Sequence, residues 1–271
     1  MKIPAFWVKE RRMIAGRQVR LRGVSPDSQQ EAEQRLEQRA QLWQNYLSSP
    51  GSMPLEQFCA ELRRLDDCLE PYSAAILEPV EQQVDSANIV TRNRYGCLVL
   101  NSVSLCFADV DCYRRGLWAR LFPNPAREQR QLTAAIRSLC EQSPELSARL
   151  YRTAHGWRVM LREPGLTVGS ARELELFTAL QADPLYVKLC RRQLCWRARL
   201  SPKPFRRGLK RYPMPDSALQ RADEWIAAYE VATHRLATCR LVETFGPTLR
   251  GEVVELHDTA TRALTPDLEL A

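Results

Sequence analysis

The sequence predicts an α+β protein with a mainly antiparallel sheet, flanking helices and a helical C-terminus. Short apolar runs bounded by polar turn residues are typical of strands, and segments with apolar residues at helical spacing lie between them. The order of strands, helices, strands, helix, hairpin and helices lacks the strict alternation of a parallel sheet. Finally, 45% hydrophobic and 26% charged residues among 271 supply a core and exclude fibrous and disordered classes.

Residues 1–86 are expected to form a hairpin followed by two helices. The hairpin covers residues 6–24 and turns at Ala15-Gly16. Ser28 and Glu31 fit a capping box, in which each side chain satisfies the other residue's backbone amide, so a helix begins there. A second helix is expected over residues 54–70. The apolar stripe of the first helix consists of Ala32, Leu36, Ala40, Trp43 and Leu47.

Residues 87–211 are expected to form an α+β core. Gly156 lies in the turn of a predicted hairpin, where we expect it to supply a positive φ. Pro202 and Pro204 exclude a helix over residues 201–204. The predicted elements are a strand meander at 89–91, 97–100 and 104–111, a helix at 126–140, the hairpin at 149–161, and helices at 171–180 and 184–195.

Residues 212–271 are expected to form a helical C-terminal segment, with helices over 217–244 and 252–263. We expect all three segments to pack as one globular unit. The acidic residues on the two C-terminal helices are interpreted as surface or capping residues rather than ligands. These residues are Glu224, Glu230, Glu243 and Asp258.

The sequence predicts a cytoplasmic protein with reduced cysteines. No stretch approaches the roughly 18 apolar residues of a membrane span, and charges stand near the N-terminus where a signal peptide would be apolar. The nine cysteines do not suggest a disulfide framework, and most are expected to be buried thiols. Cys190 and Cys195 lack the further ligands that a structural zinc site needs.

Positive charge is concentrated in one segment. The chain carries 39 basic and 32 acidic residues, but Tyr151–Arg211 alone holds fourteen basic and four acidic ones, a net charge of +10, which leaves −3 for the rest. Such a segment is typical of a surface that contacts a polyanion, although a solvated face with a membrane-surface or colloidal role is the alternative. Aromatic residues interleaved with the arginines favour nucleic acid: Trp157, Tyr186, Trp196, Phe205 and Tyr212. The predicted contacts to nucleic acid are Arg191, Arg192, Arg197, Arg199 and Arg206.

Asp109 and Asp111 end an apolar strand and project from the same face of it. Two carboxylates held in this way repel each other, and a divalent cation relieves the repulsion. We therefore predict that they hold Mg²⁺ or Mn²⁺, which would bridge nucleotide phosphates and place both residues in a catalytic site. The alternative is a strand that simply ends in solvent.

The predicted hairpin turn offers groups that bind phosphate. Besides backbone amides, it carries a hydroxyl, an imidazole and two guanidinium groups, and Lys203 between its two prolines has a preset direction. His155 has the alternative interpretation of an ordinary turn residue. The predicted phosphate-binding residues are Arg152, Thr153, His155, Gly156, Arg158 and Lys203.

The chain resembles a family of uncharacterised bacterial proteins over nearly its whole length, a resemblance that implies no activity. It rests on MKIPAFW at the start, VTRNRYG at 90–96, FADVD at 107–111, LYRTAHGWR at 150–158 and DPLYV at 183–187, continuing to Lys203-Pro204.

Residues 89–206 also show a more distant similarity to the archaeo-eukaryotic primase and primase-polymerase superfamily. The similarity implies a palm-like fold in which Asp109 and Asp111 are metal ligands. It also implies that Thr153 and Gly156 belong to the nucleotide-binding turn, with Arg158 near the position of that family's histidine. The third acidic ligand has no match: Asp183 is the nearest, and we expect it to cap a helix before Pro184.

These features predict a divergent metal-dependent nucleotidyl- or phosphoryl-transfer domain acting on nucleotide or nucleic acid. In that interpretation Arg152, Arg158 and Lys203 neutralise phosphate charge. A non-catalytic nucleic-acid-binding protein that uses residues 151–211 is the alternative. A protein-interaction module that docks through the helix at 217–244 is a third interpretation, because the Trp225/Tyr229 stripe of that helix needs a cover.

Overall fold

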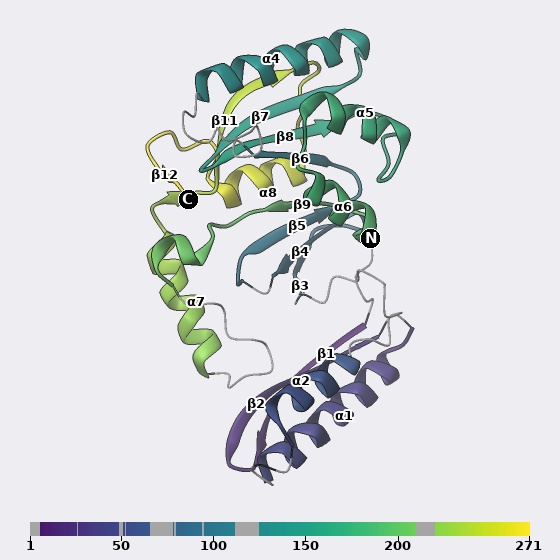
Figure 1. Ribbon diagram of the computed structural model, residues 1–271, viewed down its shortest axis with the longest axis vertical. Coiled ribbons are helices and arrows are strands. Elements are labelled where there is room, and N and C mark those ends of the chain that lie inside the picture. Colours follow the sequence, from purple (N-terminus) through teal and green to yellow (C-terminus); the bar gives the residue numbers. More distant parts are fainter. Residues whose placement is uncertain are drawn as a thin grey trace. The chain divides into compact units, whose positions relative to one another are not determined.

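A computed structural model describes residues 6–25, 27–48, 51, 53–65, 78, 80–93, 95–111, 125–209 and 220–271. The chain divides into two compact units. The larger unit comprises Pro79–Leu209 and Thr233–Ala271, and the smaller unit comprises Lys2–Glu78 and Lys210–Ala232. Helices and mainly antiparallel sheets make up the described structure, so the predicted α+β class is confirmed (Figure 1).

The smaller unit begins with the predicted hairpin, β1 (Phe6–Ile14) and β2 (Arg17–Ser25), which pair antiparallel. Its two-residue turn needs positive φ at both positions, and Ala15 (φ 47°) and Gly16 (φ 75°) provide it. Helix α1 (Gln29–Ser48) follows, then α2 (Leu55–Arg64), while residues 66–70 of the predicted second helix lie outside the described residues. Helix α7 (Gln220–Thr233) belongs mainly to this unit.

The start of α1 realises half of the predicted capping box. Ser28 Oγ accepts a hydrogen bond from the Glu31 amide at 3.1 Å. The other half would be a hydrogen bond from the Ser28 amide to the Glu31 carboxylate. Ser25 takes its place: the Ser28 amide donates to Ser25 Oγ at 3.3 Å, and Ser25 Oγ donates to the Glu31 carboxylate at 2.5 Å. The α1 stripe packs on β1 and β2 in a small core of Ile14, Val19, Leu21, Leu36 and Ala40.

The larger unit is built from two four-stranded sheets. One has the order β11-β7-β8-β6, the other β3-β4-β5-β9, and all neighbouring strands are antiparallel. The first sheet consists of β6 (Cys106–Asp111), β7 (Ser147–Thr153), β8 (Gly156–Arg162) and β11 (Cys239–Phe245). The second consists of β3 (Val80–Gln83), β4 (Asn88–Arg92), β5 (Leu98–Ser102) and β9 (Trp196–Arg199).

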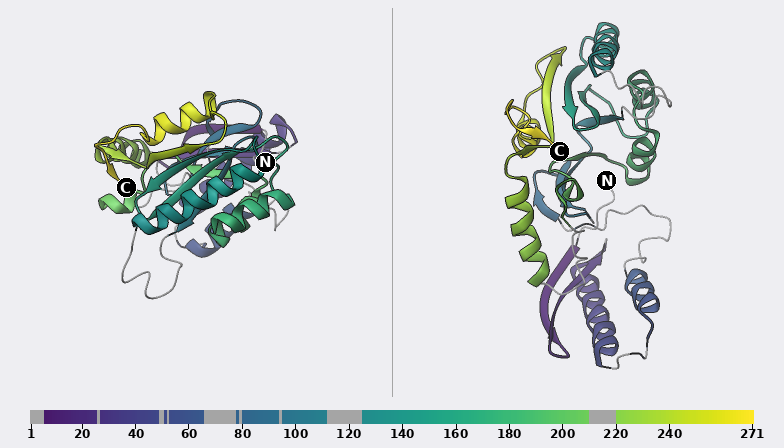
Figure 2. Two further views of the ribbon diagram at one scale, coloured as in Figure 1. Left: turned by 90° about the horizontal axis from the view of Figure 1, so that it is seen from above. Right: turned by 60° about the vertical axis from the view of Figure 1, so that its left-hand side comes forward.

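Helices cover both faces of the first sheet. Helix α4 (Pro125–Gln142) lies on one face, where Trp157 Nε1 donates to Glu128 of α4 at 3.3 Å, and α8 (Glu252–Thr261) lies on the other (Figure 2). Alternate residues of β6, β7 and β8 face α4 and α8 in turn. The buried side chains on both faces of the sheet belong to one continuous hydrophobic core. The remaining elements are α5 (Ala171–Leu180), α6 (Pro184–Gln193), the 3₁₀ turn Pro204–Arg207, β10 (Leu236–Ala237) and β12 (Glu269–Leu270).

The structure differs from the sequence predictions at three places. The strand meander is divided, because the chain passes from β5 in the second sheet to β6 in the first. The helix predicted to reach Cys195 ends at Gln193, Leu194 takes the left-handed conformation (φ 53°), and β9 follows. The helix predicted over 217–244 ends at Thr233, and Cys239–Phe245 form β11 beside β7.

Among the described residues, no helix has the length and apolarity needed to cross a membrane. Six cysteines of the larger unit are free thiols: Cys97, Cys106, Cys140, Cys190, Cys195 and Cys239. Burial raises the pKa of Cys97, Cys106 and Cys239, as expected of small apolar core residues.

Candidate phosphate-binding site

Asp109 and Asp111 end the edge strand β6 and lie on the face of the sheet that α8 covers. Asp109 is opposite Arg158 of β8, and Asp111 is opposite Gly156 at the hairpin turn. Asp109 Oδ1 accepts a hydrogen bond from Arg158 Nε at 3.1 Å, within an ion pair in which Arg158 is 2% exposed and Asp109 37%. Asp111 is exposed beyond it. The strand therefore presents one carboxylate neutralised from inside the protein and a second one at the surface.

Arg158 is buried and held from three sides. Its Nη1 donates to the backbone oxygen of Arg199 at 2.9 Å and lies 3.3 Å from His257 Nε2, in addition to the Nε bond to Asp109. A buried guanidinium with these partners has its charge balanced by protein groups. Arg158, which we predicted to contact phosphate, instead orients Asp109.

The contacts continue inward through α8. His257 Nδ1 lies 2.9 Å from Asp258 Oδ1, the same oxygen accepts from Tyr151 OH at 2.8 Å, and Arg149 pairs with Asp258 Oδ2 at 2.5 Å. Burial lowers the pKa of His257 to about 4, and burial together with Asp258 raises that of Tyr151. The chain Asp109–Arg158–His257–Asp258–Arg149, with Tyr151, is called the buried polar chain below.

The buried polar chain was not predicted from the sequence. Asp258, interpreted as a surface or capping residue, is 4% exposed, and His257 is completely buried. A signal was present, because the predicted helix at 252–263 places both residues on the same stripe as Val253, Val254 and Thr261, all of which are buried. A polar pair on an apolar helical stripe predicts buried partners on the facing strands.

Cationic side chains from three segments surround the end of β6. They come from the turn of the β7–β8 hairpin, from the end of β9 and from the turn that follows it, and they are called the cation cluster: His155, Arg199, Lys203 and Arg206. Arg152, which we predicted to bind phosphate, lies on the α4 face of the sheet instead, where its guanidinium stands 4.6 Å from the centre of the Trp157 ring. Burial lowers the pKa of Lys203, with the charges of Arg199 and Arg206 adding to the effect. The pKa of His155 is lowered by burial and then by Arg206 and Lys203. Asp111 acts in the opposite direction on both groups.

An exposed aromatic ring lies beside this cluster. The 3₁₀ turn Pro204–Arg207 ends at Gly208 (φ 70°) and is closed by a bond from the Arg206 amide to the Lys203 oxygen at 3.1 Å. Phe205 on this turn is 62% exposed, and Lys203 Nζ lies 5.8 Å from its ring centre. The turn thus presents a flat apolar surface next to positive charge.

Gly156 is required here, for a reason other than the one predicted. The glycines with positive φ do not include Gly156, and the hairpin turn consists of Ala154 and His155. A Cβ at Gly156 would lie 2.3 Å from the backbone oxygen of Val110. Gly156 therefore lets the hairpin approach the edge strand and brings Thr153 and His155 to the end where Asp111 stands.

The predicted nucleic-acid contacts are divided between two places. Arg199 and Arg206 belong to the cation cluster. Arg191 and Arg192 line a separate pocket between α5 and α6, and Arg191 Nε lies 3.4 Å from the buried Glu173. Arg197 Nη1 donates to Gln193 at 3.3 Å. The basic segment is therefore not one continuous surface.

Among the described residues, the carboxylates available to a divalent ion at the end of β6 are the two predicted ones, Asp109 and Asp111. Asp183 caps α6, where its carboxylate accepts from the Leu185 amide at 2.8 Å, although its own amide donates to the Asp109 backbone oxygen at 2.8 Å. Within the described parts of the chain, no group of three His, Cys, Asp or Glu residues forms a metal cage. Mg²⁺ commonly uses one or two carboxylates together with water and substrate phosphate, and Asp109 with Asp111 fits that pattern.

Comparison of the chain with protein-family models, curated proteins and solved structures gives no match.

Proposed function

We propose that the larger unit binds the phosphate groups of a nucleotide or nucleic acid at the cation cluster. The observation that carries this proposal is the set of basic groups that the hairpin turn, the end of β9 and the Pro204–Arg207 turn bring to the end of β6. Besides burial, Arg206 and Lys203 lower the pKa of His155, and Arg199 and Arg206 lower that of Lys203. Like charges held together destabilise each other, and a bound anion relieves that cost. Pro202 and Pro204 restrict the backbone on both sides of Lys203, so its side chain leaves the backbone in a fixed direction.

Phe205 supports nucleic acid over a simple inorganic anion. An exposed ring beside phosphate-binding cations matches the combination with which proteins hold single strands, namely cations for the backbone and a flat ring for a base. A surface built only for inorganic phosphate would have no use for an apolar ring that is 62% exposed. We therefore expect a single-stranded or extruded base over Phe205.

The experiment uses the histidines as reporters, because the chain has only three. The imidazole pKa of His155 is followed by NMR while inorganic triphosphate or a single-stranded oligothymidylate is added. Bound phosphate should raise the His155 pKa toward its ordinary value, while the buried His257 should not respond. An unchanged His155 pKa under saturating oligonucleotide would show that phosphate does not bind at this cluster.

Variants locate the site. Lys203→Gln and Arg206→Gln should each weaken oligonucleotide binding and reduce the salt dependence of the affinity by about one counterion. Arg250→Gln is the matched control: this exposed arginine follows β11, and its backbone oxygen binds Arg162 at the opposite end of β8 from the hairpin turn. Equal losses in all three variants would indicate a net-charge effect and overturn the site assignment.

A second candidate is metal-dependent phosphoryl or nucleotidyl transfer. It is favoured by one further observation, that Asp109 and Asp111 share a face of β6 while the charge of Asp111 acts on Lys203 and His155. Asp109 and Asp111 would hold Mg²⁺ or Mn²⁺, and the ion would stabilise developing phosphate charge. Lys203 would contribute positive charge from the protein.

The two candidates differ in their dependence on metal. If the second candidate is right, Mn²⁺ with a nucleoside triphosphate raises the melting temperature more than the triphosphate alone does. Asp111→Asn should abolish this extra shift. Because Asp111 is exposed, the substitution should leave the fold intact. Equal shifts with and without Mn²⁺, and no turnover, would leave phosphate binding as the function.

A further inference from the structure

A pocket of about 590 Å³ lies between α5 and α6, on elements separate from the cation cluster. The chain makes a tight helical hairpin there: α5 ends at Gln181 in the left-handed conformation (φ 55°), and Asp183 caps α6 two residues later. The pocket is therefore formed by local structure. Its lining consists of Leu174, Phe177, Thr178, Gln181, Ala182, Pro184, Val187, Lys188, Arg191 and Arg192.

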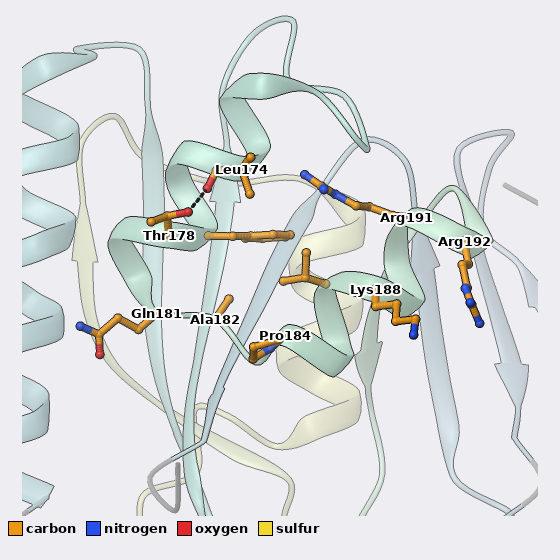
Figure 3. A pocket seen from close by; sticks show the side chains of 10 residues that line it. Leu174, Thr178, Gln181, Ala182, Pro184, Lys188, Arg191 and Arg192 are labelled. Atoms are coloured by element: carbon orange, nitrogen blue, oxygen red, sulfur yellow. Dashed lines mark hydrogen bonds between the residues drawn. The ribbon is translucent and has the colours of Figure 1, made fainter. Parts of the chain in front are cut away.

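The inner part of the pocket is apolar and fixed in position. Phe177 is 3% exposed, and its ring packs edge-on against Tyr186 at a centroid distance of 6.3 Å. Ala182 is also buried, and Leu174 at the rim is 49% exposed. Thr178 Oγ1 donates to the Leu174 backbone oxygen at 2.6 Å, so this hydroxyl is already bonded within α5 (Figure 3).

The α6 side of the pocket is cationic. Figure 3 shows Lys188, Arg191 and Arg192 projecting from α6, with Leu174 and Thr178 on α5 opposite. None of the residues that line the pocket is acidic. A ligand with one negative group would therefore find complementary charge beside apolar surface.

Arg191 is held toward the pocket by a buried carboxylate. Glu173 is completely buried and accepts hydrogen bonds from Trp196 Nε1 at 2.7 Å and from the Gly169 amide at 2.9 Å. These bonds fix the carboxylate that lies 3.4 Å from Arg191 Nε. Because Arg191 is oriented in advance, less side-chain freedom is lost when its guanidinium binds an anion.

We propose that this pocket binds a small amphipathic anion, with an aromatic or short aliphatic body over Phe177 and a carboxylate or similar anionic head at Lys188, Arg191 and Arg192. A volume near 590 Å³ lies within the range of small-molecule pockets, roughly 300–1,000 Å³. The site is independent of phosphate binding at the cation cluster, since the two share no residue.

The test uses anilinonaphthalene sulfonate, a fluorescent anion with an aromatic body, and its uncharged relative phenylnaphthylamine. The sulfonate should bind the folded full-length protein, and octanoate should displace it. The double variant Lys188→Gln/Arg192→Gln should weaken sulfonate binding about tenfold, as expected for losing charge-assisted contacts, while leaving the neutral dye unaffected. Both side chains are exposed, so the fold should survive.

Controls place the dye in this pocket. Leu174→Gln should weaken both dyes because it removes apolar surface at the rim, whereas Arg250→Gln should change neither. The proposal is overturned if the double variant binds the sulfonate as well as the native protein does. It is equally overturned if oligothymidylate displaces the dye and octanoate does not, because the α6 cations would then belong to a nucleic-acid surface.

Discussion

Arg158 Nη1 lies 3.3 Å from His257 Nε2, and this contact fixes the tautomer of the histidine. A guanidinium only donates hydrogen bonds, so Nε2 must accept, and the single imidazole proton is on Nδ1. From there it is donated to Asp258 Oδ1 at 2.9 Å. The buried polar chain thus contains two cations, two anions and one neutral histidine. Asp109 is its most exposed member, so the hydrogen bonds of the interior orient the carboxylate that the sequence singled out.

The neutral His257 makes stability depend on pH. Burial lowers its pKa from 6.5 to about 4 in the folded protein, so between these values the unfolded chain binds a proton that the folded chain does not. The contribution of the neutral His257 to the free energy of unfolding is therefore fully present above pH 6.5 and is lost as the pH falls toward 4. This loss amounts to roughly 3 kcal/mol. Urea unfolding at several pH values measures this slope.

His257→Gln provides the comparison for that slope. Glutamine has both a donor and an acceptor but does not titrate, so the variant should lose about one proton of pH dependence between pH 4 and 6.5, whatever its stability at pH 7. If the native protein and the variant show the same slope, the buried histidine is not the group responsible.

Two acidic residues that sequence reasoning treated alike should differ greatly in their effect on stability. Asp258→Asn leaves the Arg149 cation and the Tyr151 hydroxyl with a neutral amide at a buried site, which should cost about 3–5 kcal/mol. Glu243→Gln is the matched change at the surface, where Glu243 pairs with an Arg137 that is 61% exposed. That loss should stay below about 1 kcal/mol. Chemical denaturation of both variants at neutral pH gives the comparison, and similar losses would contradict the burial of Asp258.

Gly156→Ala tests the close approach of the hairpin to β6. The new Cβ would stand 2.3 Å from the Val110 oxygen, so the strands must separate, and we expect a loss of about 2–4 kcal/mol. Gly165→Ala is the control, because a Cβ there meets nothing within 4 Å and only the positive φ of 76° is strained. It should cost about 1 kcal/mol. Thermal unfolding of both variants would settle the comparison, with equal shifts arguing against the contact.

The predictions that succeeded depend on local signals. The Ala15-Gly16 turn and the Ser28 cap act over a few residues, and the structure contains both. The split of the meander depends on which sheet each strand joins, and that is decided by contacts between distant residues. The same holds for residues 239–245. Their apolar spacing is compatible with a helix, and they form a strand because they pair with β7, which is distant in the sequence.

Prediction of the candidate site was limited in the same way, because it depends on contacts between distant residues. The sequence brought Asp109, Asp111 and Lys203 to attention as residue types in suggestive patterns, but it gave no means of knowing that Lys203 would stand beside the hairpin of His155. It also assigned Arg158 to phosphate, because Arg158 follows the hairpin turn that carries the other predicted phosphate-binding groups. The partners that allow its burial come from three elements far apart in the chain: Asp109 of β6, the backbone oxygen of Arg199 of β9, and His257 of α8.

The role of Phe205 can be separated from that of the cation cluster. If its ring stacks on a base, Phe205→Ala should weaken binding of a single-stranded oligonucleotide by about 1–3 kcal/mol, roughly fivefold to 150-fold, while binding of inorganic triphosphate stays unchanged. Phe205→Trp should retain or improve the oligonucleotide affinity because it offers a larger ring. The ring is 62% exposed, so neither change disturbs the core.

A fluorescent aminopurine base in the oligonucleotide reports the stacking directly. Its emission should change on binding to the native protein and to Phe205→Trp, and should stay close to that of the free strand with Phe205→Ala at saturating protein. Loss of both oligonucleotide and triphosphate binding in Phe205→Ala would mean that the ring supports Lys203, whose ammonium lies 5.8 Å from it, rather than a base. Unchanged binding of both ligands would place the bases elsewhere while leaving the phosphates at the cation cluster.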